Sequence, residues 1–296
     1  MSDWIVLGGP SSIEIAKNLA KAMKLELVQV DYKAFPDGEG KVRLNADVMN
    51  KNVIMVHGTH PPCDTHLVQA LFIAHKLSQE GASVHACIPY LAYARQDSEF
   101  QAGEVVSLAA ISHLFRTVGV KSLVTVDIHS SHGLGYFSIP SYSVSAIPLL
   151  AEFAKEKITI NSPLAVSPDF GGSTRVEAFA RILGIEKVSL KKARSRTTGE
   201  IVMEESNVEV SGRDILLVDD MISTGTSIQR AAKYLEGFGA KRVFALCTHP
   251  LLVGRAMEIM EDAGVQEVIG TNTVPSPVSH IDVTPILADH YRTIWS

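Results

Sequence analysis

The sequence predicts an α/β protein built from two similar halves, each with a mainly parallel, Rossmann-like sheet. The clearest strand–loop–helix unit starts with the apolar run at 215–218 and continues into a helix over 228–238, whose apolar residues share one helical face. The same order of strand, loop and helix occurs at 52–79. A chain of 296 residues is long enough for about two domains. We therefore expect a duplicated plan with ligand-binding loops at the carboxyl ends of the strands.

Strands and helices alternate along the N-terminal half. Short apolar or alternating runs indicate strands, and apolar residues with helical spacing indicate helices. A Gly-Gly-Pro turn follows the first strand, and Ser11 or Ser12 can cap the first helix. In this half, strands are predicted over 4–7, 25–30, 52–56, 83–88 and 122–126, and helices over about 11–23, 65–79 and 105–115.

The C-terminal half begins at a domain boundary near 144–148 and repeats this alternation. Pro275, Pro277 and Pro285 predict an extended last connection. Here strands are predicted over 164–166, 187–190, 215–218, 241–247 and 265–269, and helices near 149–156, from 173 onward, over 228–238 and over 251–262.

The composition is that of a globular enzyme and excludes several other classes. The net charge of −5 argues against a nucleic-acid binder that neutralises phosphates. No apolar run approaches the roughly 18 residues of a membrane span, and the N-terminus does not resemble a secretory signal. The three cysteines are far apart in the sequence, which predicts a reducing compartment and no disulfide framework. We therefore expect a cytoplasmic protein without a nucleic-acid or membrane partner.

The stretch from 215 to 227 carries the strongest chemical signal. Asp219 and Asp220 are expected at the end of a buried strand, where their carboxylates can accept hydrogen bonds from sugar hydroxyls. The small residues that follow can wrap a phosphate with backbone amides and hydroxyls at the start of a helix. These phosphate-loop residues are Ser223, Thr224, Gly225, Thr226 and Ser227. A phosphate loop beside two hydroxyl acceptors predicts a ribose phosphate site.

This stretch resembles the phosphoribosyl-diphosphate motif that is shared by type I phosphoribosyltransferases and ribose-phosphate pyrophosphokinases. The motif alone does not choose between these families. Here the loop reads S-T-G-T-S, whereas the pyrophosphokinases usually have D-T-x-G-T, so it is closer to the transferase pattern. The other blocks of the chain therefore have to decide.

Two further blocks resemble the pyrophosphokinase ATP site. From the residues alone, F-P-D-G-E at 35–39 is an exposed acidic turn, and one Arg near a strand end is usually a solvated side chain. The resemblance implies that F-P-D-G-E reaches into the ATP site of a neighbouring subunit, and that Y-A-R-Q-D at 93–97 is an ATP-binding segment. The implied ATP-binding residues are Phe35, Asp37, Gly38, Glu39, Arg95, Gln96 and Asp97. The next residues, 98–101, lack the basic side chains linked in many members to allosteric control by ADP and phosphate.

The same resemblance assigns the metal and lid residues. His129 matches a histidine that contacts the catalytic divalent cation, although His132 is a second candidate. Asp169, in S-P-D-F-G-G, matches the aspartate at the magnesium and ribose site; from the residues alone, a helix cap is equally expected there. Lys192 and Arg194 match the K-x-R of a mobile lid, where they would stabilise the transition state, with Arg194 also contacting ribose 5-phosphate.

The resemblance covers nearly the full length and favours the ribose-phosphate pyrophosphokinases. It implies two type I phosphoribosyltransferase-like domains over 1–145 and 146–283, with a tail at 284–296 packing back on the first. The implied reaction transfers diphosphate from ATP to the C1 hydroxyl of ribose 5-phosphate, with Mg²⁺ and a homo-oligomer of at least two subunits. Two alternatives remain: a phosphoribosyltransferase that uses a nucleobase, and an inactive homologue that regulates an active synthase.

Overall fold

The computed structural model describes residues 3–194, 201–204 and 209–295. The chain divides into two compact units. Unit 1 comprises Met1–Ser145 and the C-terminal segment Asp282–Ser296, and unit 2 comprises Ala146–Ile281. No helix in the described part of the chain has the length and apolarity that a membrane crossing needs.

Unit 1 is organised around a seven-stranded sheet with the order β3-β2-β1-β4-β5-β6-β7. Its strands are β1 (Trp4–Gly8), β2 (Glu26–Ala34), β3 (Gly40–Leu44), β4 (Asn52–Val56), β5 (Ser83–Ile88), β6 (Val120–Val126) and β7 (Ser141–Val144). Only the β2–β3 pair is antiparallel, and it forms a hairpin at one edge of the sheet. The sheet is parallel elsewhere, because each connection runs through a crossover.

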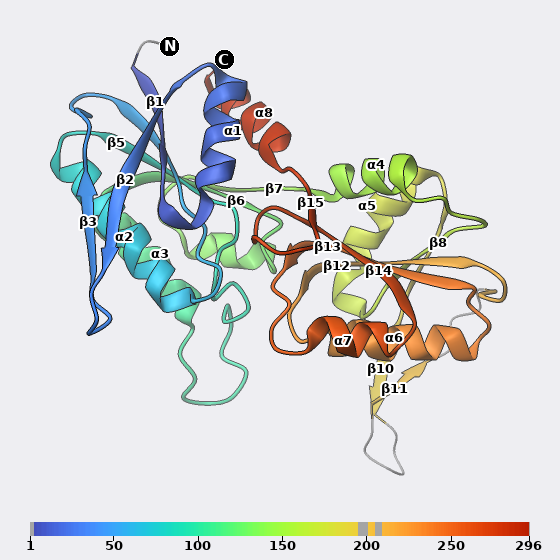
Figure 1. Ribbon diagram of the computed structural model, residues 1–296. Coiled ribbons are helices and arrows are strands. Elements are labelled where there is room, and N and C mark those ends of the chain that lie inside the picture. Colours follow the sequence, from blue (N-terminus) through green and yellow to red (C-terminus); the bar gives the residue numbers. More distant parts are fainter. Residues whose placement is uncertain (1–2, 195–200, 205–208, 296) are drawn as a thin grey trace. The chain divides into compact units, whose positions relative to one another are not determined.

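Helices cover both faces of this sheet (Figure 1). They are α1 (Ile13–Met23), α2 (Cys63–Gln79), α3 (Ser107–Thr117) and α8 (Thr284–Trp295). Apolar residues of α2 and α3, such as Ile73 and Phe115, pack with Leu7 and Met55 of the central strands. The C-terminal helix α8 lies beside α1, where Arg292 donates a hydrogen bond to the carbonyl of Ala22 at 3.0 Å. The C-terminal segment is therefore part of unit 1.

Unit 2 contains a six-stranded, fully parallel sheet with the order β15-β14-β13-β12-β8-β9. Its strands are β8 (Leu164–Ser167), β9 (Glu186–Ser189), β12 (Asp214–Ile222), β13 (Arg242–Pro250), β14 (Val265–Thr271) and β15 (Ser279–Ile281). A separate antiparallel pair is formed by β10 (Lys191–Arg194) and β11 (Ile201–Glu204).

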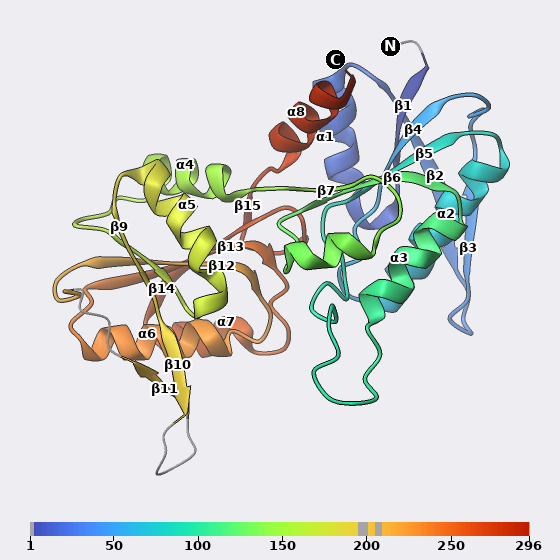
Figure 2. The ribbon, with the colours of Figure 1, turned by 180° about the vertical axis from the view of Figure 1, so that it is seen from behind.

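The helices of unit 2 lie on the two faces of its sheet, as both ribbon views show (Figure 2). They are α4 (Ile147–Lys157), α5 (Ser173–Leu183), α6 (Thr226–Gly237) and α7 (Ala256–Glu261). Alternate residues of β12 enter different cores: Ile215 and Leu217 pack on the α6 side, and Leu216 and Val218 on the α4–α5 side. This arrangement explains the unbroken apolar run in the sequence, because a parallel strand with two covered faces needs apolar residues at every position.

Among the elements that differ from the sequence-based expectation, two have bounds with a clear physical explanation. The strand predicted to end at Val218 continues to Ile222, because β13 runs on beside it and Met221 pairs with His249. The helix predicted from 251 begins at Ala256. Leu252 and Gly254 have left-handed backbones, with φ values of 47° and 65°, so an α-helix cannot pass through them.

Candidate functional site

The predicted ribose phosphate residues lie at the carboxyl edge of the unit 2 sheet. Asp169 follows β8, and Asp219 and Asp220 lie near the end of β12, the neighbouring strand. The strand that follows β8 in the sequence, β9, lies on one side of the β8–β12 strand pair, and the strand that follows β12, β13, lies on the other side. Such a switch in strand order opens a crevice at the carboxyl ends of the strands, where open α/β sheets bind their ligands.

The acidic pair lies inside β12, and its two carboxylates differ in exposure. The side chain of Asp219 is 14% exposed, whereas that of Asp220 is 3% exposed. The backbone amide of Asp220 donates a hydrogen bond to Asp219 Oδ1 at 2.9 Å. Burial raises the pKa of Asp219 well above its usual range, and the neighbouring charge of Asp220 raises it further. Asp219 therefore presents the more accessible acceptor of the two.

A guanidinium that the sequence analysis missed faces both carboxylates. Arg175 Nη1 lies 3.5 Å from Asp219 Oδ1, and Arg175 Nη2 lies 3.4 Å from Asp220 Oδ1. The positive charge of Arg175 partly offsets the rise in the pKa of Asp219. A weak sequence signal existed: Arg175 falls in the first turn of a predicted helix, where a basic residue opposes the helix dipole and needs an acidic partner.

The loop after β12 provides the predicted phosphate-binding backbone. Helix α6 begins at Thr226, so Thr226 and Ser227 form its first turn, and no side chain in the described part of the chain caps it. The first amides of a helix lack intrahelical partners, so they can donate hydrogen bonds to an anion. The hydroxyls of Thr224 and Thr226 lie 3.0 Å apart. Thr224 is exposed, and Ser223, Thr226 and Ser227 are partly exposed, which leaves the loop accessible to a ligand.

Gly225 has the backbone conformation that this loop requires. Its φ is 76°, and an added Cβ would lie 2.9 Å from the carbonyl oxygen of Ala256 and 3.1 Å from Met260 Cγ. A side chain at this position would therefore meet both backbone strain and a steric clash. The glycine lets the chain turn from β12 into α6 while α7 packs closely against it.

We expect Gly225→Ala to lower the free energy of unfolding by about 1–2 kcal/mol or more, because alanine disfavours a left-handed backbone. We also expect weaker ribose 5-phosphate binding, since the loop must shift away from Ala256. Gly237→Ala is the matched control: it lies at the end of the same helix, its φ is not positive, and an added Cβ would meet no described atom within 4 Å. Denaturant unfolding and calorimetric titration should show both losses for Gly225→Ala only. Equal behaviour of the two variants would contradict this role of Gly225.

Asp169 caps the short 3-10 turn at Phe170–Gly172 that leads into α5, whereas α5 itself has no side-chain cap among the described residues. The amide of Gly172 donates to Asp169 Oδ1 at 3.3 Å, and Ser167 Oγ donates to the Asp169 carbonyl at 2.7 Å. Asp169 is also near enough to Asp219 to raise its pKa. Within the described residues, no three His, Cys, Asp or Glu side chains form a ready metal cluster. A divalent ion here would need ligand oxygens from substrate or water, as is usual for Mg²⁺.

The ATP-binding residues predicted in the F-P-D-G-E block lie at the tip of the β2–β3 hairpin. The amide of Phe35 donates to the Glu39 carbonyl at 2.8 Å, and the amide of Glu39 donates to Asp37 Oδ1 at 3.0 Å. Phe35, Asp37, Gly38 and Glu39 are all exposed, and the ring of Phe35 is within 5.3 Å of Lys33 Nζ. The hairpin therefore holds these side chains at the surface of unit 1.

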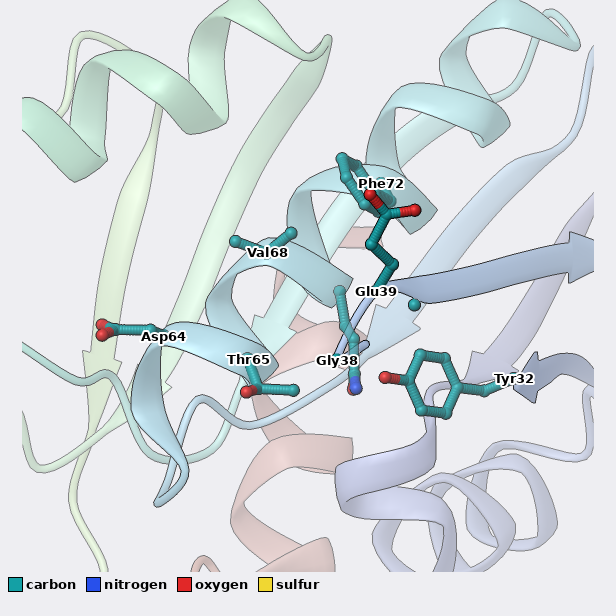
Figure 3. A pocket seen from close by; sticks show the side chains of 9 residues that line it. Tyr32, Gly38, Glu39, Asp64, Thr65, Val68 and Phe72 are labelled. Carbon is teal, nitrogen blue, oxygen red and sulfur yellow. The ribbon is translucent and has the colours of Figure 1, made fainter. Parts of the chain in front are cut away.

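A pocket of about 590 Å³ lies between this hairpin and α2. Figure 3 shows its lining side chains, with Tyr32 and Glu39 from the hairpin and Thr65, Val68 and Phe72 from the helix. All of its lining residues belong to unit 1, and they lie on the side of the hairpin that faces α2.

The other predicted ATP and metal residues follow neighbouring strands of unit 1. Arg95 and Gln96, in the loop after β5, are exposed, whereas Asp97 is buried. His129 follows β6 and is exposed, and so is His132, whose ring packs edge-on against Tyr136. Tyr136 in turn donates its hydroxyl to the carbonyl of Asp97 at 2.7 Å. The structure thus brings the 93–97 block and the 131–136 segment into contact.

The predicted lid residues are described through their backbone alone. Lys192 and Arg194 belong to β10, where they pair with Met203 and Ile201 of β11. Their side chains, and the rest of the basic run at 195–199, lie outside the described residues.

The two predicted metal residues come from different units: His129 belongs to unit 1, and Asp169 belongs to unit 2.

Comparison with known proteins identifies relatives along the whole chain. Residues 4–119 match the N-terminal domain of ribose phosphate pyrophosphokinase, and residues 200–295 match the phosphoribosyl synthetase-associated domain. The ribose-phosphate pyrophosphokinase of Saccharolobus solfataricus is 36% identical over 96% of this chain and 99% of its own length. That of Methanopyrus kandleri is 35% identical over 96% of this chain and 97% of its own. The crystal structure of phosphoribosylpyrophosphate synthetase from Mycobacterium smegmatis has a TM-score of 0.87 at 27% identity, covering 99% of both chains.

Proposed function

The chain belongs to the ribose-phosphate pyrophosphokinase family, and from this premise we propose how its residues carry out the family reaction. The enzyme transfers diphosphate from ATP to the C1 hydroxyl of ribose 5-phosphate, giving AMP and phosphoribosyl diphosphate for nucleotide biosynthesis. A new bond forms between the C1 oxygen and the β-phosphorus, and the bond from the β-phosphorus to the oxygen that leaves with AMP breaks. The proton of the C1 hydroxyl is released to water. Such a transfer needs in-line positioning and neutralisation of charge more than covalent help from the protein.

Ribose 5-phosphate is bound at the unit 2 switch point in this proposal. The acidic pair Asp219 and Asp220 accepts hydrogen bonds from the ribose hydroxyls, with Asp219 as the accessible partner. The 5-phosphate lies against the start of α6, where the residues from Ser223 to Ser227 offer amides and hydroxyls. The observation that carries the proposal is the juxtaposition, on one β-strand and the helix after it, of an acidic pair and a helix start without a side-chain cap among the described residues.

The ATP site combines residues of unit 1 with the hairpin of a second subunit. Arg95 and Gln96 contact the nucleotide in their own subunit, next to the buried Asp97. Phe35 stacks on the adenine of the partner's ATP, while Asp37 and Glu39 accept hydrogen bonds around the base. This role is supported by the exposure of the hairpin tip, where an aromatic ring that is 37% exposed would otherwise face water. The functional protein is then a homo-oligomer, a dimer or larger.

Mg²⁺ is the cofactor in this proposal. Asp169, Asp219 and Asp220 bring carboxylate oxygens to the same edge of the sheet, and oxygen ligands suit a hard divalent cation. Asp169 and His129 would hold the ion together with substrate oxygens. When bound, it would neutralise the charge of the triphosphate. From the lid, Lys192 and Arg194 stabilise the charge that develops on the transferred group, and Arg194 also contacts ribose 5-phosphate.

The reaction is tested by incubating the purified protein with ATP, ribose 5-phosphate and Mg²⁺ and following AMP. We expect AMP in amounts equal to the phosphoribosyl diphosphate formed. A nucleobase phosphoribosyltransferase would instead release diphosphate only when a base and phosphoribosyl diphosphate are supplied. An inactive regulatory homologue would form no product in either assay. The cytoplasmic location expected from the cysteine usage stays a prediction.

The shared ATP site predicts recovery of activity between two inactive variants. Phe35→Ala impairs the hairpin that contributes to the ATP site of the partner subunit. Lys192→Ala impairs the lid that contributes to the site of its own subunit. After subunit exchange, half of the dimers are hybrids, and each hybrid has one site with an intact hairpin and an intact lid. We therefore expect the mixture to regain about a quarter of the wild-type activity. If the mixture is no more active than its two components, each site is built from one subunit.

A further inference from the structure

Arg175 bridges the acidic pair with two different nitrogens. It lies in the first turn of α5, and its side chain is 17% exposed. Nη1 faces Asp219 and Nη2 faces Asp220, at 3.5 Å and 3.4 Å. Because the guanidinium is planar and rigid, a contact through two nitrogens fixes the spacing between the two carboxylates. A point charge such as an ammonium could not hold both in this way.

The residues around Arg175 leave room for this arrangement. A Cβ on Gly172 would lie 3.3 Å from Arg175 Nη1 and 2.2 Å from Ser167 Oγ, so a side chain there would press on the guanidinium. The Gly172 amide is at the same time held by the carboxylate of Asp169. The turn between β8 and α5 therefore places the bare backbone of Gly172 next to the guanidinium.

The contacts of Arg175 engage one oxygen of each carboxylate. Both ion pairs are made to Oδ1 atoms, and Asp219 Oδ1 also accepts the amide of Asp220. The ion-pair distances exceed the roughly 2.7–2.9 Å of the tightest charge-assisted hydrogen bonds. Arg175 thus partly offsets the charge of the pair through contacts that are longer than a tight charge-assisted hydrogen bond.

We propose that Arg175 is a positioning residue of the ribose site: it holds Asp219 and Asp220 in the arrangement in which the pair, mainly through the more accessible Asp219, accepts hydrogen bonds from the ribose hydroxyls. The inference rests on the proposed role of the acidic pair in binding ribose 5-phosphate. It predicts that Arg175 acts on the affinity for the sugar rather than on the diphosphate transfer itself.

The test compares Arg175→Gln and Arg175→Lys with Arg242→Gln. Arg242 is the matched control because it also pairs with an aspartate of β12, the buried Asp214, with Nε 2.9 Å from Asp214 Oδ1, at the other end of the strand. Calorimetry measures the Kd for ribose 5-phosphate without ATP, and thermal unfolding measures stability. We expect Arg175→Gln to raise this Kd by about 10–100-fold, the range typical for losing one charged hydrogen bond, here between the misplaced acidic pair and the sugar. Arg175→Lys should fall in between, and Arg242→Gln should lower the unfolding temperature without changing the Kd.

A double-mutant cycle separates positioning from a general effect on folding. If Arg175 acts through the acidic pair, Arg175→Gln should raise the Kd much less in an Asp219→Asn background than in the wild type. Additive effects, or a normal Kd for Arg175→Gln, would overturn the proposal. Should Arg175→Gln fail to fold, Arg175→Lys keeps the charge and gives the same readout. A wild-type protein that does not bind ribose 5-phosphate would instead contradict the proposed function.

Discussion

Replacing Lys192 by alanine is expected to lower the rate of AMP formation by about 10³-fold or more, with little change in the affinity for ribose 5-phosphate. A cation that closes over the transferred group acts mainly in the transition state, and removing such a group costs on the order of 10³–10⁵ in turnover. Substrate binding rests on other residues, so the KM for the sugar should change by only a few-fold. Steady-state assays at saturating ATP measure both values.

Lys187→Ala is the control for the lid variant. Lys187 lies on β9, just before the strand that carries Lys192, and pairs with Glu177 at the surface at 2.9 Å. An exposed ion pair contributes little to stability or to a distant reaction, so this variant should keep near-normal turnover. If Lys192→Ala had the same turnover as Lys187→Ala, the proposed role of Lys192 in the lid would be wrong.

The fold class was predictable because the strands are buried on both faces. Every residue from Ile215 to Val218 is fully buried, so the strand appears in the sequence as an unbroken apolar run. The prediction of two mainly parallel α/β sheets is confirmed by the observed sheets and by the structural match. The hairpin strand β3 was missed although Val42 and Leu44 alternate with Lys41 and Arg43, because a five-residue edge strand gives only a short alternating pattern.

The continuation of β12 through the acidic pair could not be predicted from its own residues. Aspartate is depleted in strands, so the apolar pattern stops at Val218. The strand is extended by backbone pairing with β13, up to Ile222 and Pro250. Neighbouring strands, which the local sequence does not specify, therefore decide where the carboxylates lie relative to the strand end.

The candidate site also combines residues that the local sequence predicts with a contact that it does not. The residues from Asp219 to Ser227 are contiguous, so their spacing alone predicted a phosphate loop beside hydroxyl acceptors. Arg175 comes from another helix, 44 positions before Asp219 in the sequence, and faces the pair because β8 lies next to β12 in the sheet. A contact that depends on strand order leaves no local pattern. The same holds for the buried state of Asp220, which its sequence neighbours do not distinguish from that of Asp219.

Asp219→Asn is expected to lower kcat/KM for ribose 5-phosphate by about 10–100-fold and at the same time to stabilise the protein. An amide of the same shape loses the charge-assisted hydrogen bond to a sugar hydroxyl, which is typically the stronger kind. In the folded protein, however, the carboxylate is buried beside Asp220, and both effects raise its pKa. Removing its charge relieves that repulsion, so function and stability should change in opposite directions.

The pH dependence of this stabilisation has a definite sign. Because the pKa of Asp219 is raised on folding, the native state holds the proton at pH values where the unfolded chain has lost it. Stability contributed by this group is therefore lost as pH rises from the ordinary aspartate range toward the raised pKa. The unfolding temperature of Asp219→Asn should exceed that of the wild type by a margin that grows with pH over this interval.

Asp214→Asn provides the opposite case on the same strand. The hydrogen bonds from Arg242 lower the pKa of Asp214, so its ionised form stabilises the fold, and this stability is lost as pH falls through the lowered pKa. Asp214→Asn should therefore lower the unfolding temperature at neutral pH and leave the KM for ribose 5-phosphate unchanged. A destabilised Asp219→Asn variant with normal kcat/KM would mean that Asp219 belongs to the scaffold, as Asp214 does. Both aspartates of β12 would then stabilise the fold, and the proposed assignment of sugar binding to Asp219 would be wrong.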